Sequence, residues 1–422
     1  MARKMKDSGI EWIGEIPEGW ETINPKALFI QRKDRASKGE RQLTSSQQYG
    51  ILYQDEYMEL TGSKVVTVEK DFDILKHVEA GDFVISMRSF QGGLEYSTKS
   101  GAISSAYVML VPNLELVYPR FYRWLLKSSV YIDALQRTTN MVRDGQAMRY
   151  SNFAQVRLFT LPLDEQKSRA DFLDLECSSI DKILFKTRSS IEEYKKLKQA
   201  VITQAVTKGV RGKREMKDSG VEWIGEIPKE WDILNLVAHT SMLTPMRDRP
   251  ENLDGPIPWI RIEDFDGKYI SSSKASLGVS KETVRSMNLK IYPVGTILCT
   301  SSCIMGKCAI VSRELVSNQR FIGIIPDQNT CENFLYYLML SNSERMNYLA
   351  TGALQANLSR SSFEHLKVQF PSYQEQKEIA DYLDAKCAEI DGLIAKKEQL
   401  VKELESYKKS LIYEVVTGKR EV

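Results

Sequence analysis

Apolar residues recur at alternating spacings of three and four along two long, highly charged segments. One apolar seam starts at Leu173 and the other at Leu383. A hydrophobic repeat of seven residues is typical of helices that pair in a coiled coil. The pattern therefore predicts two helices, from about Asp164 to Val206 and from about Tyr373 to Val416, each on the order of 60 Å long.

Both seams have polar residues at equivalent layers, including Lys198 in the first and Lys408 in the second. Polar residues at matching layers are a device by which paired helices fix their register. The apolar seam residues that we expect between the helices are Leu173, Ile180, Leu184, Ile191, Tyr194, Val201, Leu383, Ile390, Ile394, Val401, Leu404 and Leu411.

The ends of both helices carry their own signals. Gly209 and Gly418 follow the last apolar positions and are expected C-terminal stops. Ser372 stands three residues before Glu375, which is the spacing of a capping box at the start of the second helix.

The chain is an internal repeat. Residues 5–21 return as residues 216–232, and Glu165-Gln166-Lys167 returns as Glu375-Gln376-Lys377. A repeat of this length predicts two equivalent domains about a pseudo-two-fold axis, with the long helices packed antiparallel and the domains at opposite ends. Two independent dimerisation helices are the alternative.

A mixed domain with β-rich segments precedes each long helix, which predicts an α+β fold. The predicted strands are 64–69, 82–86, 107–111, 295–299 and 321–325, and aromatic helices are expected at 121–126 and 334–339. The predicted domains are a leader at 1–21, a mixed domain at 22–160, a helix at 161–215, a second leader at 216–232, a second mixed domain at 233–370 and a final helix at 371–422.

Composition narrows the function classes. Short, charge-interrupted apolar runs predict a cytoplasmic protein without a signal peptide or membrane span. The six cysteines form no Cys-x-x-Cys pair and only three histidines are present, so we expect buried thiols and no metal site. Residues 22–160 hold 18 Lys and Arg against 14 Asp and Glu, so any nucleic-acid binding must come from local basic loops.

Several short sequence motifs follow one another in a set order along the chain, in addition to the repeat. They are Gly81–Ser86, Phe90–Gly93, Leu161–Pro162 before Glu165–Lys167, Ile257–Ile260, Gly295–Leu298, Gly352–Ser359, and Phe370–Pro371 before Glu375–Lys377. The ordered set covers the whole chain and resembles the DNA-specificity subunits of type I restriction-modification enzymes.

The resemblance implies a division of labour. Each mixed domain would be a target-recognition domain that reads one half of a split, asymmetric site in double-stranded DNA. The paired helices would set the gap and dock two methyltransferase subunits, with ATP-dependent restriction subunits as further partners. S-adenosylmethionine, ATP and magnesium are then expected in the partner subunits, and this chain would carry no cofactor and perform no catalysis.

Three other functions are alternatives to this one. A stand-alone enzyme lacks a phosphate-binding loop or an amino-methyltransferase signature. Pro326-Asp327 with Glu375-Gln376-Lys377 superficially resembles a metal-dependent nuclease motif, but acidic residues at a helix start explain the second part. A protein-protein scaffold that bridges partners without touching DNA is the main alternative.

Candidate DNA contacts are polar residues in loops between the predicted framework strands, because such side chains read base edges and phosphates. They are Thr44, Ser45, Gln47, Arg88, Ser89, Gln91, Gly92, Arg143, Gln146, Arg149, Tyr150, Arg261, Ser302, Lys307, Gln319, Arg320, Gln355, Asn357 and Arg360. For any single one, a structural role stays open: Arg88 could pair with a carboxylate, Gln355 and Asn357 could cap a turn, and Tyr150 could be core. We favour phosphate contact for Arg149 and Arg360.

Four tryptophans belong to the repeated leaders: Trp12, Trp20, Trp223 and Trp231. A partner hot spot is one possible role for such residues. We favour a structural one, in which they attach each leader to the base of a long helix.

Overall fold

The computed structural model describes residues 3–68, 72–87, 89–138, 148–245, 248–302, 306–350 and 358–422. The chain forms two compact units. Unit 1 is Met1–Arg188 with Gln399–Val422, and unit 2 is Ser189–Glu398. Each unit contains part of both long helices, so the finer division into leaders, mixed domains and helices stays a prediction.

Unit 1 is built on a four-stranded antiparallel sheet flanked by short pairs of strands. The order in the sheet is β4 (Phe29–Arg32), β11 (Val108–Pro112), β8 (Phe83–Ile85) and β9 (Glu95–Tyr96). The pairs are β1 (Met5–Asp7) with β2 (Glu15–Pro17), β3 (Glu21–Ile23) with β12 (Leu158–Thr160), β5 (Leu43–Ser46) with β6 (Gly50–Tyr53), and β7 (Lys76–Val78) with β10 (Gly101–Ile103). Its short helices are α1 (Pro25–Leu28), α2 (Gln54–Thr61), α3 (Ser89–Gly92), α4 (Pro119–Leu125), α5 (Ser129–Arg137) and α6 (Tyr150–Gln155).

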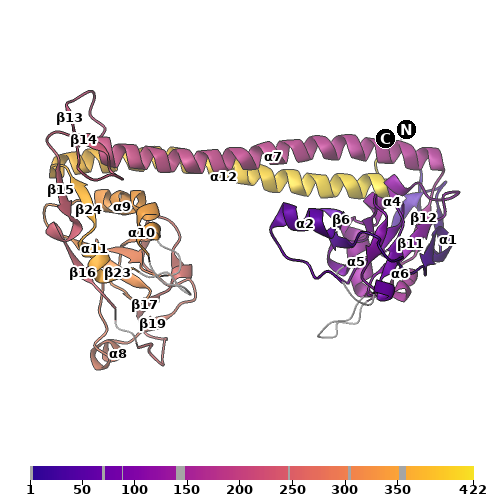
Figure 1. Cartoon of the computed structure of the whole chain (residues 1–422), viewed down its shortest axis with the longest axis horizontal. Helices are drawn as coiled ribbons and strands as arrows, with labels where there is room; N and C mark the ends of the chain where they lie inside the picture. The colour runs from indigo at the N-terminus through magenta and orange to yellow at the C-terminus, as the bar shows by residue number, and fades with distance from the viewer. Residues whose placement is uncertain are drawn as a thin grey trace. The chain divides into compact units, whose positions relative to one another are not determined.

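Unit 2 repeats the leader hairpin and the strand pair at the helix base, and has larger sheets (Figure 1). The hairpin is β13 (Met216–Asp218) with β14 (Glu226–Pro228), and the base pair is β15 (Asp232–Asn235) with β24 (Lys367–Phe370). The five-stranded order is β16 (Thr240–Leu243), β23 (Phe321–Pro326), β20 (Ile297–Thr300), β21 (Cys308–Val311), β18 (Tyr269–Ile270). The three-stranded order is β19 (Gly278–Val279), β17 (Ile257–Ile260), β22 (Val316–Ser317), and the short helices are α8 (Lys281–Ser286), α9 (Glu332–Ser341), α10 (Ser343–Leu349) and α11 (Arg360–Glu364).

The predicted strand at 64–69 is wrong for the part that the structure describes. Residues 64–68 have no regular structure, and Val66 is 86% exposed. The side chain of Gln42 takes the place of a partner strand, since its amide bonds both the N–H and the C=O of Val68. Alternation of apolar residues therefore did not produce a strand where a side chain supplied the backbone hydrogen bonds. The other four predicted strands correspond to β8, β11, β20 and β23.

The two long helices form as expected. They are α7 (Leu163–Lys208) and α12 (Tyr373–Val416), and glycines at φ 74° and 75°, Gly209 and Gly418, follow them. Left-handed φ values favour glycine, which explains why both helices stop there. The capping box is only half formed: Ser372 Oγ accepts from Glu375 N at 3.4 Å, whereas the Glu375 carboxylate bonds other groups.

Within each unit the two helices run antiparallel (Figure 1). In unit 1 Lys408 donates to Asp181 at 2.6 Å, and in unit 2 Lys198 donates to Asp391 at 2.6 Å. Each lysine and each aspartate is 210 positions from its counterpart. The polar breaks in the seams are thus one cross-helix ion pair that occurs twice.

The predicted seam residues line these helix contacts. Unit 1 packs Leu173, Ile180 and Leu184 into a core that also contains Leu411. Seven of the twelve are buried and the other five, Tyr194, Val201, Ile394, Val401 and Leu404, are half-buried.

A buried glutamine joins each mixed domain to its long helix. Gln166 accepts from Tyr118 N at 2.7 Å and donates to the carbonyls of Leu116 and Leu161. In unit 2, Gln376 accepts from Cys331 N at 2.8 Å and donates to the carbonyls of Asn329 and Pro371. Both side chains are almost fully buried, so all three polar contacts are made away from water.

The neighbouring glutamate joins the leader to the same helix start. Glu165 accepts from Trp20 Nε1 at 3.1 Å and pairs with Arg3. Glu375 accepts from Trp231 Nε1 at 3.0 Å and pairs with Arg214 at 2.6 Å. Burial alone would raise the pKa of Glu165, but hydrogen bonds from Arg3, Arg169 and Trp20 lower it to about 2. We call the glutamate and glutamine contacts together the helix-base lock.

Replacing Gln376 by Leu should lower the free energy of unfolding by about 2 to 4 kcal/mol, because three buried backbone groups lose their partner. Gln166→Leu should cost a similar amount in unit 1. Urea unfolding followed by circular dichroism measures both. Exposed Gln374→Leu is the matched control on the same helix. An unchanged unfolding midpoint in both buried variants would contradict the lock.

Candidate nucleic-acid interface

The structure brings two of the predicted loops of unit 1 together. Thr44 and Ser45 lie half-buried in β5, and Gln47 is exposed at the tip of the β5–β6 hairpin. A Cβ at Gly92, the last residue of α3, would lie 2.7 Å from Gln47 Cγ. Gln47 thus contacts the end of α3, where the neighbouring Gln91 is exposed, and we call these two residues together the glutamine surface. The hydroxyl of Ser89 lies inside the domain, where it accepts from Ser86 N at 2.8 Å.

Arg149 and Tyr150 begin helix α6 and differ in exposure. Arg149 is exposed, and its backbone N–H is capped by Asn152 Oδ1 at 3.0 Å. Tyr150 is half-buried: its ring stacks on Phe153 and its hydroxyl donates to Phe29 O at 3.3 Å. The core role left open for Tyr150 thus has contacts in its favour, whereas Arg149 is free to face solvent.

Three predicted loops of unit 2 converge on Ser301. Its N–H donates to Arg320 O at 2.8 Å, and its carbonyl accepts from Leu358 N at 2.9 Å. Next to it, Thr300 N donates to Lys307 O at 2.9 Å. Lys307, Gln319 and Arg320 are exposed, so the convergence gathers two cations and an amide, which we call the Ser301 junction. Ser302 itself is buried.

Arg261 and Arg360, the other two arginines predicted to contact DNA in unit 2, have carboxylate neighbours. Arg360 donates to Glu364, one turn along α11, at 2.7 Å. Arg261 Nε lies 3.8 Å from Glu263, and its backbone N–H donates to Asp264 at 2.7 Å. Arg360 is 56% exposed, and exposed ion pairs contribute at most about 1 kcal/mol, so a phosphate could replace Glu364 at little cost.

Five predicted contacts lie outside the described residues: Arg88, Arg143, Gln146, Gln355 and Asn357.

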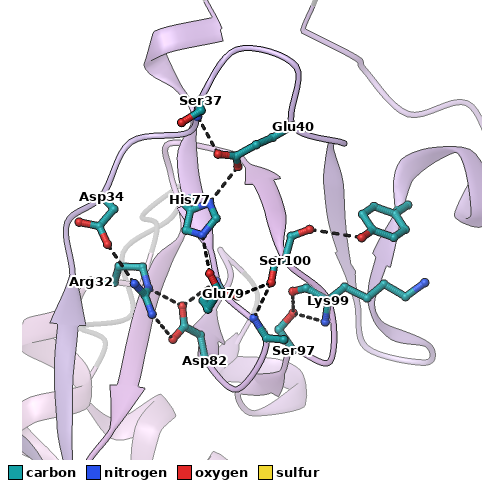
Figure 2. A network of polar contacts seen from close by, with 12 residues as sticks. Arg32, Asp34, Ser37, Glu40, His77, Glu79, Asp82, Ser97, Lys99 and Ser100 are labelled. Atoms are coloured by element: carbon teal, nitrogen blue, oxygen red, sulfur yellow. Dashed lines mark hydrogen bonds and ion pairs between the residues drawn. The ribbon is translucent and has the colours of Figure 1, made fainter.

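Sequence reasoning missed a polar network in unit 1, which Figure 2 shows. His77 lies between two carboxylates, with Nδ1 2.9 Å from Glu40 and Nε2 3.0 Å from Glu79. Arg32 forms a two-pronged contact with Asp82, at 2.7 and 3.0 Å. The partners are far apart in sequence and share no periodicity, so no pattern identified them. The network fixes the loop before β5 against β7 and the central sheet.

The tryptophans divide into two kinds. Trp20 and Trp231 are fully buried in the helix-base lock, as the structural interpretation expects. Trp12 instead donates to Arg157 O at 3.2 Å and packs edge-on against Tyr131 of α5. Trp223 is 43% exposed and lies under the Arg345 guanidinium, 4.0 Å from its ring centre.

The residues of the nuclease-like phrase do not form a metal site among the described residues. Glu375 is engaged in the lock, while Asp327 pairs with His239 at 3.0 Å. The described part of the chain has no group of three side chains suited to hold a metal ion. Likewise, no described helix is long and apolar enough to cross a membrane.

Comparisons with known proteins agree with this architecture. Residues 232–403 match the type I restriction modification DNA specificity domain. A putative type I restriction enzyme MjaX specificity subunit of Methanocaldococcus jannaschii is 24% identical over 96% of this chain and 95% of its own length. Over nearly its whole length the chain is thus similar to a type I restriction-modification specificity subunit. The general role of this family is DNA recognition.

Two further similar proteins differ in how much of this chain they cover. The MjaIX specificity subunit of the same organism is 34% identical, over 38% of this chain and 38% of that protein. A chain from a type I R-M system, solved for its complex assembly and conformational transition, has the same fold. Its TM-score is 0.73 at 12% identity, with 96% of this chain and 99% of that chain covered.

Because burial opposes protonation of His77 but Glu40 and Glu79 outweigh it, the pKa of His77 is raised above 6.5. The stabilisation of the folded state by protonated His77 is therefore complete below pH 6.5 and is lost as pH rises through the higher pKa of His77 in the folded state. We expect unit 1 to unfold more easily at pH 9 than at pH 6, and His77→Gln to abolish that difference. Urea unfolding at both pH values measures it, and NMR titration of the three histidines gives the pKa. His365→Gln is the control. A His77 pKa below 6.5 would contradict the network.

Proposed function

We propose that this chain selects the DNA site of a type I restriction-modification complex, reading a bipartite, asymmetric sequence with one mixed domain per half-site. One observation carries the proposal: the same helix-base lock attaches two unlike mixed domains to one repeated helix scaffold. A constant attachment with different exposed surfaces suits a protein that reads two different half-sites with one framework.

The exposed candidates have distinct roles in this proposal. Gln47 and Gln91 of the glutamine surface read base edges in the first half-site, since glutamine amides pair with adenine. Lys307 and Arg320 of the Ser301 junction contact the second half-site. Arg149 and Arg360 contact phosphates, as basic side chains at the starts of the comparable helices α6 and α11.

The proposal also assigns the partners. Two methyltransferase subunits dock on the long helices, and restriction subunits join them. Leu175 and Phe185 of α7 are 66% and 75% exposed, and large apolar side chains outside a helix seam favour a protein interface. S-adenosylmethionine, ATP and magnesium are then bound by those subunits, and this chain performs no chemical step.

Affinity for specific DNA should fall linearly with salt on logarithmic axes, with a slope of about −0.9 for each phosphate contacted. If Lys307 and Arg320 contact phosphates, each alanine variant should reduce the slope by about one. Gel-shift titration of the complex at four salt concentrations measures this, with exposed Lys402→Ala on α12 as the control. Binding that ignores salt, or a complex that binds no DNA, would favour the scaffold alternative.

Exchanging residues 22–160 for the equivalent segment of a relative should change one half-site and leave the other as it was. The physical reason is that Gln166 of α7 bonds main-chain groups of the mixed domain, which a relative's segment supplies again. Sequencing of methylated sites in a host that expresses the hybrid and its methyltransferase gives the result. A change in both half-sites would disprove independent reading.

A further inference from the structure

A buried ion pair lies beneath the glutamine surface of unit 1. Glu95 of β9 is only 4% exposed. Lys127, which follows α4, places Nζ 2.7 and 2.9 Å from its two carboxylate oxygens. The same Nζ lies 3.5 Å from the main-chain oxygen of Gln47 at the hairpin tip. One ammonium group therefore connects a buried carboxylate to the backbone of a proposed base-reading residue.

Glycines allow the surrounding segments to approach this pair. A Cβ at Gly50, the first residue of β6, would lie 3.8 Å from Glu95 Oε2, so the carboxylate lies directly beside the hairpin. A Cβ at Gly93, where φ is 77°, would lie 2.4 Å from Leu126 O. The end of α3 thus packs on the main chain of Leu126 and Lys127, and the Gln47 side chain lies against Gly92. Little freedom remains for the hairpin relative to α3.

We propose that Lys127 and Glu95 are positioning residues for the first half-site, holding the Gln47 backbone so that the Gln47 and Gln91 amides stand at a fixed separation. This inference rests on the proposed function. Pairing of two glutamines with bases needs both amides placed within a fraction of an ångström, and rigid buried support provides that. Neither Lys127 nor Glu95 touches DNA in this scheme.

The second mixed domain supports its own surface without such a pair. Gly306, at φ 80°, lies close to Ser343, the first residue of α10. In β9 Glu95 pairs with Val84 of β8, whereas at the matching place of unit 2 Ala309 of β21 pairs with Leu298 of β20. The second half-site is therefore an internal control in the same molecule.

The test uses the full chain, expressed with its methyltransferase partner, and reads the methylated sites by sequencing. Lys127→Met alone leaves a buried carboxylate unpaired and should lower the melting temperature. Lys127→Met with Glu95→Met replaces the pair by apolar side chains of similar size, which is often neutral for stability. The double variant should therefore melt close to the parent, yet lose about 10-fold or more in discrimination at one base pair of the first half-site. Lys127→Arg alone, which keeps a cation beside Glu95, should keep the parental discrimination.

A second variant tests the position of Gln47 by a change at the surface. Gly92→Ala places a methyl group 2.7 Å from Gln47 Cγ and should displace that flexible side chain without disturbing the core. It should relax the first half-site and leave the second unchanged. Gly19→Ala is the matched control, because a Cβ there meets nothing within 4 Å.

Two results would overturn the inference. One is parental discrimination at the first half-site in a double variant or Gly92→Ala variant that melts like the parent. The other is an equal loss at both half-sites, which would indicate general damage. A parent protein that methylates no bipartite site would instead remove the proposed function on which the inference rests.

Discussion

The hydrogen bonding of two adjacent side chains at the start of each long helix is the constraint on which the rest of the structure depends. A buried glutamine must satisfy one donor and one acceptor of the mixed domain and a carbonyl just before the helix, and a glutamate must accept from a buried indole and an arginine. Buried polar groups are costly when unpaired, so these contacts permit one geometry between helix and domain. The loops of the mixed domains can vary because the attachment does not.

The ends of the chain complete the repeat without a covalent connection. In unit 2 the main chain runs from α7 through Gly209 into the second leader. In unit 1 the corresponding junction is open, and Arg169 closes it by donating to Val415 O at 2.8 Å and Arg420 O at 2.9 Å. The counterpart of Arg169 is Ile379, whose side chain cannot donate hydrogen bonds. A fully buried guanidinium in one half thus takes the position of an apolar side chain in the other.

The scaffold could be predicted from sequence, whereas the supports of the recognition surfaces could not. Heptads, glycine stops and the repeat are local or periodic, and they gave the long helices and their antiparallel pairing. The Glu-Gln phrase was recognised, but its role depends on Tyr118 and Trp20, which are remote in sequence. His77 meets Glu40 at a separation of 37 residues, and Lys127 meets Glu95 at 32. No period relates such partners, so only the fold brings them together.

The two mixed domains attach different surfaces to one repeated framework. In each, a glycine lies close to the end of a helix: Gly93 to Leu126 after α4, and Gly306 to Ser343 at the start of α10. The matching strand positions differ, since Glu95 of β9 is paired with Lys127 and unit 2 has Ala309 of β21 there. A buried charge cannot be exchanged for an apolar side chain without changing its partner as well. If each mixed domain reads one half-site as proposed, its specificity depends on the exposed loop together with the buried support, and the whole domain is the smallest part that transfers both.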